Sequence, residues 1–363
     1  MLACSSILQY RHSKYAGNHG DVLKHFVYVQ VLRLSLLRDT NNNNDDLILI
    51  DTHAGIGNYV LENDNKECKD GILRLLEWKR SDLPVPVQYY AGLIDGKDEE
   101  EEKALNYKRK GEDQTVNSEI VYSGSPILAR RVVWKHRSVH NLSPYPQHFL
   151  FEWNPSQFEL LQQSILQDQQ DTTSDLVASN VDYSDGFQGA VRLVENLVAE
   201  NTNFSVPNQN RVVVLIDPPF KDVPLECRLV QSTVQKLLEI QPACTIMVWL
   251  PILKDPKSNN GIQLLLQELK KMPIGHQKPT EENPTTTTTT TSRASRRDWI
   301  SASIQVAQEQ GLLGSTVWVA NPPHGLKEVL EPTVPWLAKC LEQTCSGSQL
   351  ETSQSPATSS IEQ

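Results

Sequence analysis

Short, continuously apolar segments alternate with longer segments of helical periodicity along most of this chain. The apolar segments are residues 47–50, 148–152, 212–216, 244–252 and 315–323. Strands that are apolar on both faces are typical of parallel sheets, which helices cover on both sides. The alternation therefore predicts an α/β fold with a central, mostly parallel sheet between two layers of helices.

The segments between the predicted strands repeat their apolar residues every three to four positions, which indicates helices. The predicted helices are residues 21–38, 71–79, 158–167, 188–200, 229–240 and 262–269, with one more after Ser123. We expect one domain over residues 1–342, with a helical and charged insertion at residues 64–120. Residues 276–297 contain a threonine tract and residues 343–363 are polar, so we expect a disordered loop and a disordered tail.

Bulk properties exclude several classes of protein. The 363 residues carry a net charge of −10, so binding to nucleic acid requires a local basic patch. The six cysteines are scattered and form no Cys-x-x-Cys pair, which disfavours disulfides and structural zinc. The sequence has no apolar run of membrane-spanning length and no evident signal peptide. We expect an intracellular monomer in the cytoplasm, with an organelle as the alternative.

A carboxylate follows each of four predicted strands, as Asp51, Glu152, Asp185 and Asp217. The carboxyl ends of parallel strands meet at one edge of the sheet, where ligands bind. Four acids at that edge suit a cationic or hydroxyl-rich ligand better than a polyphosphate. A carboxylate such as Glu152 can accept hydrogen bonds from two ribose hydroxyls, although an ordinary solvated acid is the alternative interpretation.

The first predicted strand leads into a turn rich in small residues, DTHAGIG at residues 51–57. Gly55 and Gly57 allow the backbone to approach a ligand closely. Position 60 is Val60, so the third glycine of the dinucleotide-binding fingerprint is absent. A simple strand-to-helix turn explains the same residues.

The fourth of these strands ends in Asp217-Pro218-Pro219-Phe220. The Asp217 carboxylate and the Pro218 carbonyl are two hydrogen-bond acceptors at one point, and Phe220 offers a flat ring. Two acceptors that draw on an adenine exocyclic amine would localise its lone pair for attack on an electrophilic methyl group. The prolines stiffen the turn, and the ring can stack on a base that has left its helix. The alternative interpretation is a proline-rich turn that closes a strand.

A second Pro-Pro turn, NPPH at residues 321–324, provides a comparison within the chain. It also follows an apolar strand, but it has Asn321 in place of the acid and His324 in place of the aromatic ring. We expect this second turn to be structural.

The N-terminal segment at residues 10–26 combines basic residues with aromatic ones. It contains Tyr10, Tyr15 and Lys24 together with Arg11, His12, Lys14, His19 and His25. In an acidic protein this segment is the best candidate for a basic surface that contacts RNA phosphates and unpaired bases. Metal binding by its histidines is the weaker interpretation, because no acid or cysteine lies at ligand spacing.

Several of these motifs together resemble the RlmJ family. They are YRHSKYAGNHGDVLKH, LIDTHAGIGNY, SGSPILAR, DGF, VLIDPPF and VPWL, in that order, over residues 8–342 apart from the inserts. The resemblance implies a Rossmann-like class I methyltransferase that uses S-adenosylmethionine to methylate N6 of an adenine in large-subunit ribosomal RNA. The substrate would be free or partly assembled rRNA, without any metal ion.

The resemblance also implies roles for single residues. Asp217 would be the catalytic acceptor, Pro218 would help through its carbonyl, and Phe220, which replaces the more usual tyrosine, would stack on the base. The cofactor would be held by His25, His53, Gly55, Ser125, Glu152, Asp185 and Gly186. Tyr10 and Lys24 would lie on the substrate RNA side of the pocket.

The residues alone leave other functions open. The same chemistry suits an adenine-N6 DNA methyltransferase or a protein glutamine-amide methyltransferase. A methyltransferase-like module that binds RNA without catalysis is a further class. An intact Asp217 in its Pro-Pro-Phe context favours an enzyme.

Overall fold

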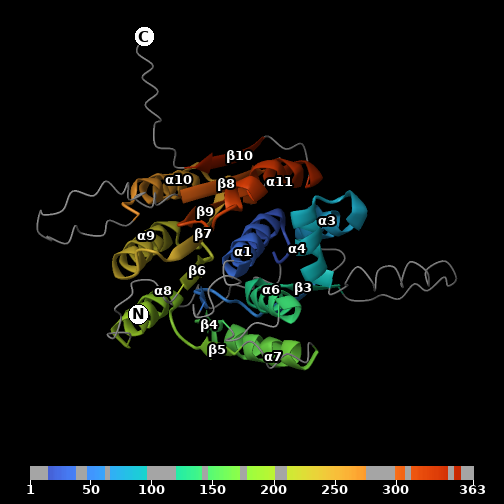
Figure 1. Ribbon diagram of the computed structural model, residues 1–363. Coiled ribbons are helices and arrows are strands. Elements are labelled where there is room, and N and C mark those ends of the chain that lie inside the picture. The colour runs from blue at the N-terminus through green and yellow to red at the C-terminus, as the bar shows by residue number, and fades with distance from the viewer. Residues whose placement is uncertain are drawn as a thin grey trace, which may run out of the picture.

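An eight-stranded sheet runs through the middle of the computed structural model, in the order β10-β8-β9-β7-β6-β1-β4-β5 (Figure 1). The structure describes residues 15–37, 47–61, 66–95, 120–140, 146–171, 178–200, 211–274, 299–306, 312–341 and 347–352. The strands of this sheet are β1 Leu47–Asp51, β4 Gln147–Phe151, β5 Ser179–Asp182, β6 Arg211–Ile216, β7 Thr245–Leu253, β8 Trp299–Gln305, β9 Leu312–Ala320 and β10 Gly347–Thr352.

Five neighbouring strands of the sheet are parallel. β1 lies between β4 and β6, with Ile50 opposite Phe149 on one side and Val214 on the other, and β5 and β7 continue the parallel set. β9 runs antiparallel to β7, and β8 and β10 complete an antiparallel edge. The predicted α/β fold with a mostly parallel sheet is confirmed, and the antiparallel edge is an addition to it.

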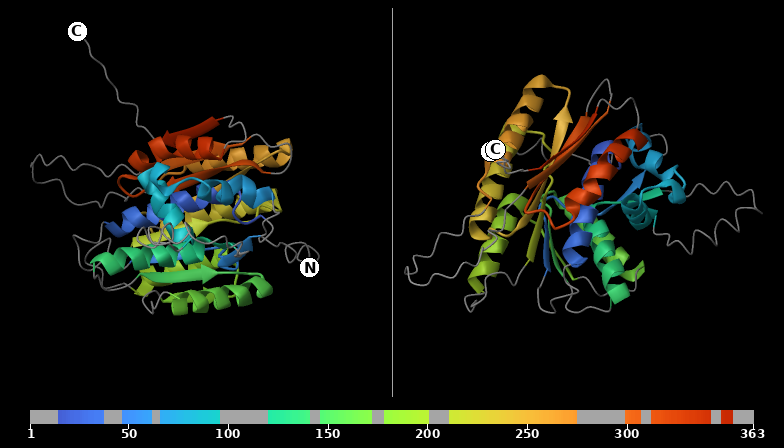
Figure 2. Two further views of the ribbon diagram at one scale, coloured as in Figure 1. Left: turned by 90° about the vertical axis from the view of Figure 1, so that its right-hand side faces the viewer. Right: turned by 45° about the horizontal axis from the view of Figure 1, so that its top comes forward.

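Alternate residues of each central strand face two separate hydrophobic cores. In β1, Leu47 and Leu49 belong to one core, whereas Ile48 and Ile50 belong to the other. Helices α1, α6 and α11 lie on the first side and α8, α9 and α10 on the second, so the sheet is the middle of three layers (Figure 2). The long helices are α1 His19–Leu37, α6 Ser125–His140, α7 Pro155–Asp171, α8 Gly186–Glu200, α9 Val223–Ile240, α10 Pro256–Lys271 and α11 Leu326–Cys340.

Helix α1 is buried on all sides rather than amphipathic. Every residue from His19 to Leu32 is buried, because the helix packs against the sheet, α6, α11 and the insertion. A helix enclosed in this way has no solvent face, and its few charged side chains need partners inside the protein.

The expected insertion at residues 64–120 is described in part. Its described segments are α2 Lys66–Cys68, the π-helix η4 Lys69–Leu73, α3 Arg74–Leu76, the 3₁₀-helix η5 Arg80–Asp82 and α4 Val85–Asp95. A two-stranded antiparallel sheet of β2 Asn58–Leu61 and β3 Ile120–Ser123 flanks these segments. Residues 96–119, with most of the acidic insert, lie outside the described residues.

Two strands contradict the expected C-terminal organisation. Residues 315–323 were expected to hold the last strand, but residues 347–352 of the expected disordered tail form β10, which pairs with β8. β8 was also missed, although its buried Ile300, Ala302 and Ile304 alternate with polar residues in the way that is typical of a strand. The expected disordered loop at residues 276–297 lies outside the described residues.

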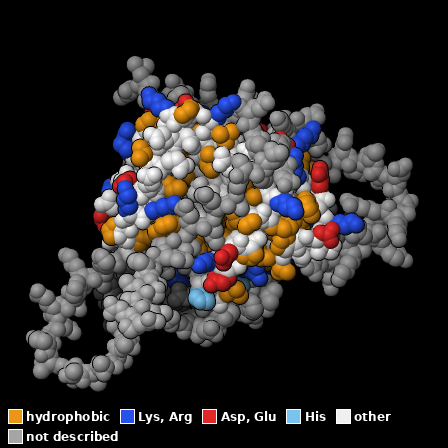
Figure 3. All heavy atoms as spheres, turned by 90° about the horizontal axis from the view of Figure 1, so that it is seen from above, with side chains coloured by type: hydrophobic (Ala, Val, Ile, Leu, Met, Phe, Trp, Pro, Cys, Tyr) orange, Lys and Arg blue, Asp and Glu red, His pale blue; other side chains and the backbone are white. Residues whose placement is uncertain are grey.

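The described surface carries mixed charges. On the face above α10 and α11, described lysines and arginines are spread singly among apolar and acidic side chains (Figure 3). None of the described helices combines the length and the apolar character that crossing a membrane requires.

Candidate active site

A cavity of about 510 Å³ opens at the carboxyl edge of the parallel strands. This volume is typical of sites for small molecules and cofactors. The cavity is lined by every described residue that the sequence predicted for the site: Lys24, His25, His53, Gly55, Ser125, Glu152, Asp185, Gly186, Asp217, Pro218 and Phe220. Tyr10 lies outside the described residues.

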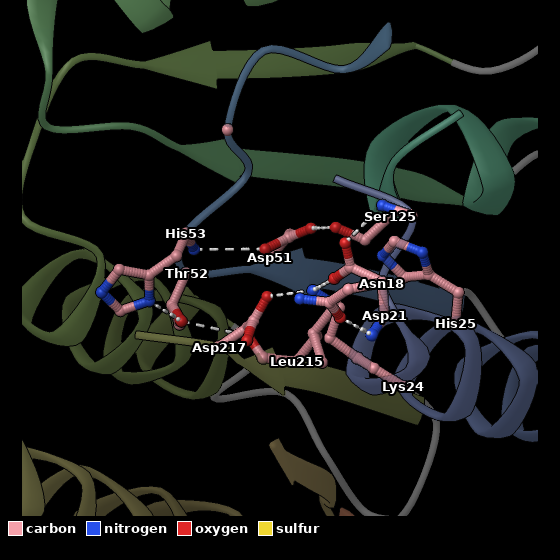
Figure 4. A network of polar contacts seen from close by, with 12 residues as sticks. Asn18, Asp21, Lys24, His25, Asp51, Thr52, His53, Ser125, Leu215 and Asp217 are labelled. Atoms are coloured by element: carbon pink, nitrogen blue, oxygen red, sulfur yellow. Dashed lines mark hydrogen bonds and ion pairs between the residues drawn. The ribbon is translucent and has the colours of Figure 1, made fainter. Parts of the chain in front are cut away.

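Asp217 lies immediately after β6 and is held by a buried lysine. Its Oδ2 atom is 2.6 Å from Lys24 Nζ, and Lys24 Nζ is 2.8 Å from Asp21 Oδ1. Figure 4 shows Lys24 reaching from α1 between the two carboxylates. No described residue donates to the other oxygen of Asp217, Oδ1, so this oxygen is available to a ligand.

The burial of Lys24 corrects the prediction of a basic surface on this part of the chain. The Lys24 side chain is 4% exposed, and His19 and His25 are buried as well. Burial alone would lower the pKa of Lys24, but the charges of Asp21 and Asp217 outweigh it and raise the pKa. Burial lowers the pKa of His19 to about 4, so its ring is neutral at physiological pH. The side chains of these three residues therefore form no solvent-exposed basic surface.

Phe220 adopts a left-handed backbone conformation with φ of 47°. A bulky residue adopts this conformation at a cost of about 1–3 kcal/mol, and such strain persists mainly where the surroundings enforce it. The Phe220 ring is 6% exposed and lies 6.2 Å from the Trp249 ring of β7, at an angle of 54°. The Phe220 ring therefore packs against the core of the protein while it lines the cavity.

Asp51 is fully buried behind the cavity wall, so only three of the four strand-end acids line the cavity. Ser125 Oγ donates to Asp51 Oδ2 at 2.6 Å, and the backbone N–H of His53 donates to Oδ1 at 3.1 Å. Burial raises the pKa of Asp51 to about 6, against the opposing hydrogen bond from Ser125. Asp51 thus fixes the start of the glycine turn and the beginning of α6.

Glu152 connects the end of β4 to the glycine turn. Its Oε2 accepts the N–H of Gly55 at 3.0 Å, and its Oε1 accepts the N–H of Asn154 at 2.7 Å. Burial raises the pKa of Glu152 to about 7, although both backbone hydrogen bonds oppose this. Each carboxylate oxygen keeps a second lone pair, so Glu152 can still accept hydrogen bonds from a ligand.

The two predicted histidines have neighbours that restrict their chemistry. Thr52 Oγ1 donates to Leu215 O at 3.1 Å and lies 2.8 Å from His53 Nδ1. A hydroxyl has one hydrogen, so His53 must donate from Nδ1, which leaves Nε2 as an acceptor. Burial lowers the pKa of His53 to about 3. His25 is hydrogen-bonded through Nδ1 to the hydroxyl of Tyr122.

Gly186 brings the start of α8 very close to the end of β1. A Cβ atom at this position would lie 1.8 Å from Thr52 O, so no larger residue fits without moving the backbone. The preceding Asp185 accepts the N–H of Gln188 at 3.1 Å and thereby caps the helix. Asp185 and Gly186 therefore form a tight rim on the cavity.

The sequence did not identify several residues of the cavity. Asp21 lies three positions before Lys24, a helical ion-pair spacing that was present in the sequence as a signal. Trp249 was hidden inside a continuous apolar strand, and Glu226 precedes the helix that was predicted at residues 229–240. Among the described residues, no group of three or more histidines, cysteines or acids could hold a metal ion.

The chain is similar to known proteins in sequence and in fold. The family described as Ribosomal RNA large subunit methyltransferase D, RlmJ, matches residues 44–277. The crystal structure of a Legionella pneumophila protein matches with a TM-score of 0.59 over 94% of this chain and 99% of that chain. Its 19% sequence identity supports the fold alone.

Two curated proteins named Ribosomal RNA large subunit methyltransferase J are similar over nearly their whole length. The protein from Haemophilus influenzae is 26% identical over 94% of this chain and 97% of its own. The protein from Escherichia coli is 25% identical over 91% of this chain and 93% of its own. Because the family model covers well over half of the chain, the predicted resemblance is confirmed, and this protein belongs to the RlmJ family of ribosomal RNA large-subunit methyltransferases.

Proposed function

We propose that this protein transfers a methyl group from S-adenosylmethionine to N6 of an adenine in large-subunit ribosomal RNA. The observation that carries the proposal is the position of the Asp217-Pro218-Pro219-Phe220 turn. It lines the same cavity as the glycine turn and the rim at Gly186. Family membership supports the proposal, as do the names of the two bacterial relatives.

The residues on one side of the cavity fit S-adenosylmethionine. Gly55 lines the cavity with a left-handed φ of 65°, and a Cβ there would meet the Tyr59 hydroxyl at 2.3 Å, so the turn requires glycine at this position. Glu152 would hold the two ribose hydroxyls, and Asp185 with Gly186 would meet the adenine ring. His25, His53 and Ser125 would lie along the methionine part. When bound, this cofactor supplies an electrophilic methyl group on a positively charged sulfur atom.

The residues on the opposite side of the cavity from the cofactor would prepare the adenine amine that accepts the methyl group. Asp217 Oδ1 and the Pro218 carbonyl would accept the two hydrogens of the adenine amine, which localises the nitrogen lone pair. Lys24 holds the other carboxylate oxygen, so Asp217 is oriented before the substrate enters. Phe220 would stack on the base, and Tyr10 would approach the RNA.

The pKa values within the cavity suit this division of labour. His53 is neutral near pH 7 because burial lowers its pKa to about 3, so it adds no positive charge beside a cationic donor. Glu152, with a pKa raised to about 7 by burial, gains most as a hydrogen-bond acceptor above that pH. The cofactor side is therefore neutral to acidic, which favours a sulfonium ion over a phosphate group.

The decisive experiment compares substrates for the purified protein. Naked large-subunit rRNA, adenine-containing DNA and a glutamine-containing protein are each incubated with methyl-labelled S-adenosylmethionine, and nucleoside digests are analysed by mass spectrometry. We expect N6-methyladenosine from the rRNA alone. Methyl transfer only to DNA or protein would favour those alternatives, and cofactor binding without transfer to any substrate would favour a non-catalytic module.

Further properties belong to the same proposal. We propose a monomer that acts on free or partly assembled large-subunit rRNA without a metal ion. Sedimentation of the purified protein tests the monomer. Comparison of naked rRNA with isolated subunits as substrates tests the state of assembly. We propose the cytoplasm as its location, and fluorescence imaging of the tagged chain distinguishes this from an organelle.

A further inference from the structure

The backbone donors that follow the two prolines are gathered by one side chain. Pro218 and Pro219 have no N–H group, so the amides of residues 220–222 are the first donors after Asp217. The N–H of Asp222 donates to Glu226 Oε2 at 2.9 Å. Backbone interactions from Phe220 and Lys221 also lower the pKa of the Glu226 carboxylate, so these two amides lie close to it. One carboxylate therefore faces three successive amides of the turn.

Glu226 reaches the turn because it lies in the first turn of α9. Asp222 is the N-cap of this helix, and its Oδ1 accepts the N–H of Leu225 at 3.1 Å. Glu226 returns to the N–H of Asp222, which gives a reciprocal arrangement like a capping box, with the glutamate one residue later. The start of α9 and the end of the Asp-Pro-Pro-Phe turn are thus tied to the same carboxylate.

The amides near the Glu226 carboxylate belong to the strained part of the turn. Phe220 has a φ of 47°, and these amides are its own and the two that follow. Successive amides around a left-handed residue form a concave nest that binds an anion. Here the anion is a side chain of the protein, which can hold Phe220 in a conformation that its own sterics disfavour.

The partial burial of Glu226 at the cavity indicates that this arrangement is more than a helix cap. Glu226 lines the same cavity as Asp217 and Pro218. Burial raises the pKa of Glu226 to about 7, the charge of Asp222 adds to the rise, and the three backbone hydrogen bonds oppose it. Carboxylates that are desolvated in this way concentrate at functional sites.

We propose that Glu226 is a positioning residue for methyl transfer, because its carboxylate holds the turn that aims Asp217 and the Pro218 carbonyl at the acceptor amine. This inference rests on the proposed function. Glu226 acts through the backbone of residues 220–222 and touches neither the reacting nitrogen nor the methyl group. Its loss therefore slows the transfer step and leaves the opposite, cofactor side of the cavity intact.

The test uses the full chain with Glu226→Ala, the isosteric Glu226→Gln and the control Glu239→Ala. Glu239 lies on the same helix, is exposed and accepts only the side chain of Gln235 at 2.8 Å among the contacts that the structure describes. Three quantities are measured: the Kd of S-adenosylmethionine by calorimetry, kcat and KM for naked large-subunit rRNA, and hydrogen exchange of the amides of residues 220–222.

For Glu226→Ala we expect a kcat lower by about 10- to 100-fold, the size of effect that a misplacement near 1 Å produces. The Kd of the cofactor should stay at the wild-type value, and the amides of residues 220–222 should exchange faster. Glu226→Gln keeps one carbonyl oxygen in place and should recover part of kcat. Glu239→Ala should match the wild type in all three quantities.

Three results would overturn the proposal: a wild-type kcat in Glu226→Ala, loss of cofactor binding together with kcat, or a higher KM for RNA at unchanged kcat. The last result would make Glu226 a direct RNA contact. If Glu226→Ala does not fold, Glu226→Gln decides alone, since a wild-type kcat despite faster exchange of the amides of residues 220–222 refutes the proposal. If the wild-type chain binds the cofactor but methylates no rRNA, the proposed function fails. The exchange data would still show whether Glu226 holds the amides of residues 220–222.

Discussion

The two Pro-Pro turns of this protein follow strands of the same sheet and lie at opposite edges of it. Asp217-Pro218-Pro219-Phe220 follows β6, which is parallel to its neighbours, so the turn lies at the cavity edge. The turn at residues 321–324 follows β9, which is antiparallel to β7, with Ala320 opposite Ile246. It therefore lies at the other edge of the sheet. The direction of the strand, rather than the prolines, decides which turn can meet a ligand.

The first residues of the two turns show the same contrast. Asp217 is paired with Lys24 and keeps one oxygen available inside the cavity. Asn321 uses its amide to donate to Pro242 O at 3.0 Å and Cys244 O at 2.8 Å, and its own carbonyl accepts from Thr245 Oγ1 at 2.8 Å. An acid that is oriented for a ligand thus corresponds to a side-chain amide whose two hydrogens are both donated to backbone carbonyls of the fold.

Both turns contain a left-handed residue, but its cost differs. Asn321 has a φ of 46°, a conformation that asparagine tolerates well. Phe220 has a φ of 47°, which is unfavourable for a bulky side chain. The turn at residues 321–324 thus has a residue that suits its left-handed backbone. The turn at the cavity has a phenylalanine in the same conformation, at a cost in backbone strain.

The largest effect that we expect comes from Asp217→Ala. Loss of this acceptor should lower kcat on rRNA by about 10²–10³-fold, the usual cost of removing one preorganised polar group. Cofactor affinity, measured by calorimetry, should remain, because Lys24 keeps Asp21 as its partner. Retained turnover would refute the catalytic role of Asp217, and the two Pro-Pro turns would then no longer differ in function.

The second prediction concerns the other turn, where a substitution should affect stability and leave activity unchanged. Asn321→Gly keeps the left-handed backbone without strain but removes both amide hydrogen bonds, so the free energy of unfolding should fall by about 1–3 kcal/mol. Urea denaturation measures this, and kcat on rRNA at 25 °C should equal that of the wild type. A loss of kcat without a loss of stability would contradict the structural role of this turn.

A third prediction concerns pH at the cavity edge. Burial raises the pKa of Glu152 to about 7 and that of Asp51 to about 6. A raised folded pKa gives stability that is fully present below the unfolded pKa, near 4, and is lost as the pH rises through the folded pKa. The buried histidines, with lowered folded pKa values, oppose this below their unfolded pKa of about 6.5, so the free energy of unfolding of the apo protein should fall from pH 6.5 to pH 8.

Cofactor binding should respond to pH in the opposite direction. If Glu152 accepts ribose hydroxyls, affinity should strengthen as the carboxylate ionises, by at most about tenfold per pH unit. Calorimetry at pH 6 and pH 8 measures this dependence, and Glu152→Gln should weaken binding and flatten the profile. An equally steep profile in Glu152→Gln would exclude Glu152 as its source.

The smallest expected effect comes from making the turns more alike. His324→Phe gives the second turn the ring of the first, and because His324 is exposed at the other edge, activity should not change. Phe220→Tyr should likewise preserve kcat within about threefold, since the ring and its contact with Trp249 remain. Activity gained through His324→Phe would show that the sequence of the turn outweighs its place in the sheet.

The residues at the cavity edge could largely be predicted from the sequence. The strand-end positions of Glu152, Asp185 and Asp217 follow from strand periodicity, and the structure brings them to one cavity. The interior ion pairs were less accessible. Lys24 and His19 suggested a solvated basic surface, because a local sequence does not reveal that α1 is enclosed on every side.

The remaining misses have a common physical cause. β10 pairs with β8 through backbone hydrogen bonds, which no particular side-chain pattern is needed to form. Glu226 acts on backbone amides of a turn four to six residues earlier in the chain, and a glutamate in a helical segment carries no sign of this in its sequence context. Side chains that accept hydrogen bonds from backbone amides can be identified only once the course of the backbone is known.

The pairing of β10 with β8 also bears on how the chain matures. Residues 347–352 follow every other strand of the sheet, so during synthesis β8 emerges from the ribosome well before the strand that covers it. Through that interval its outer backbone groups are open to another nascent chain. Shortening the protein before residue 347 would make that temporary vulnerability permanent.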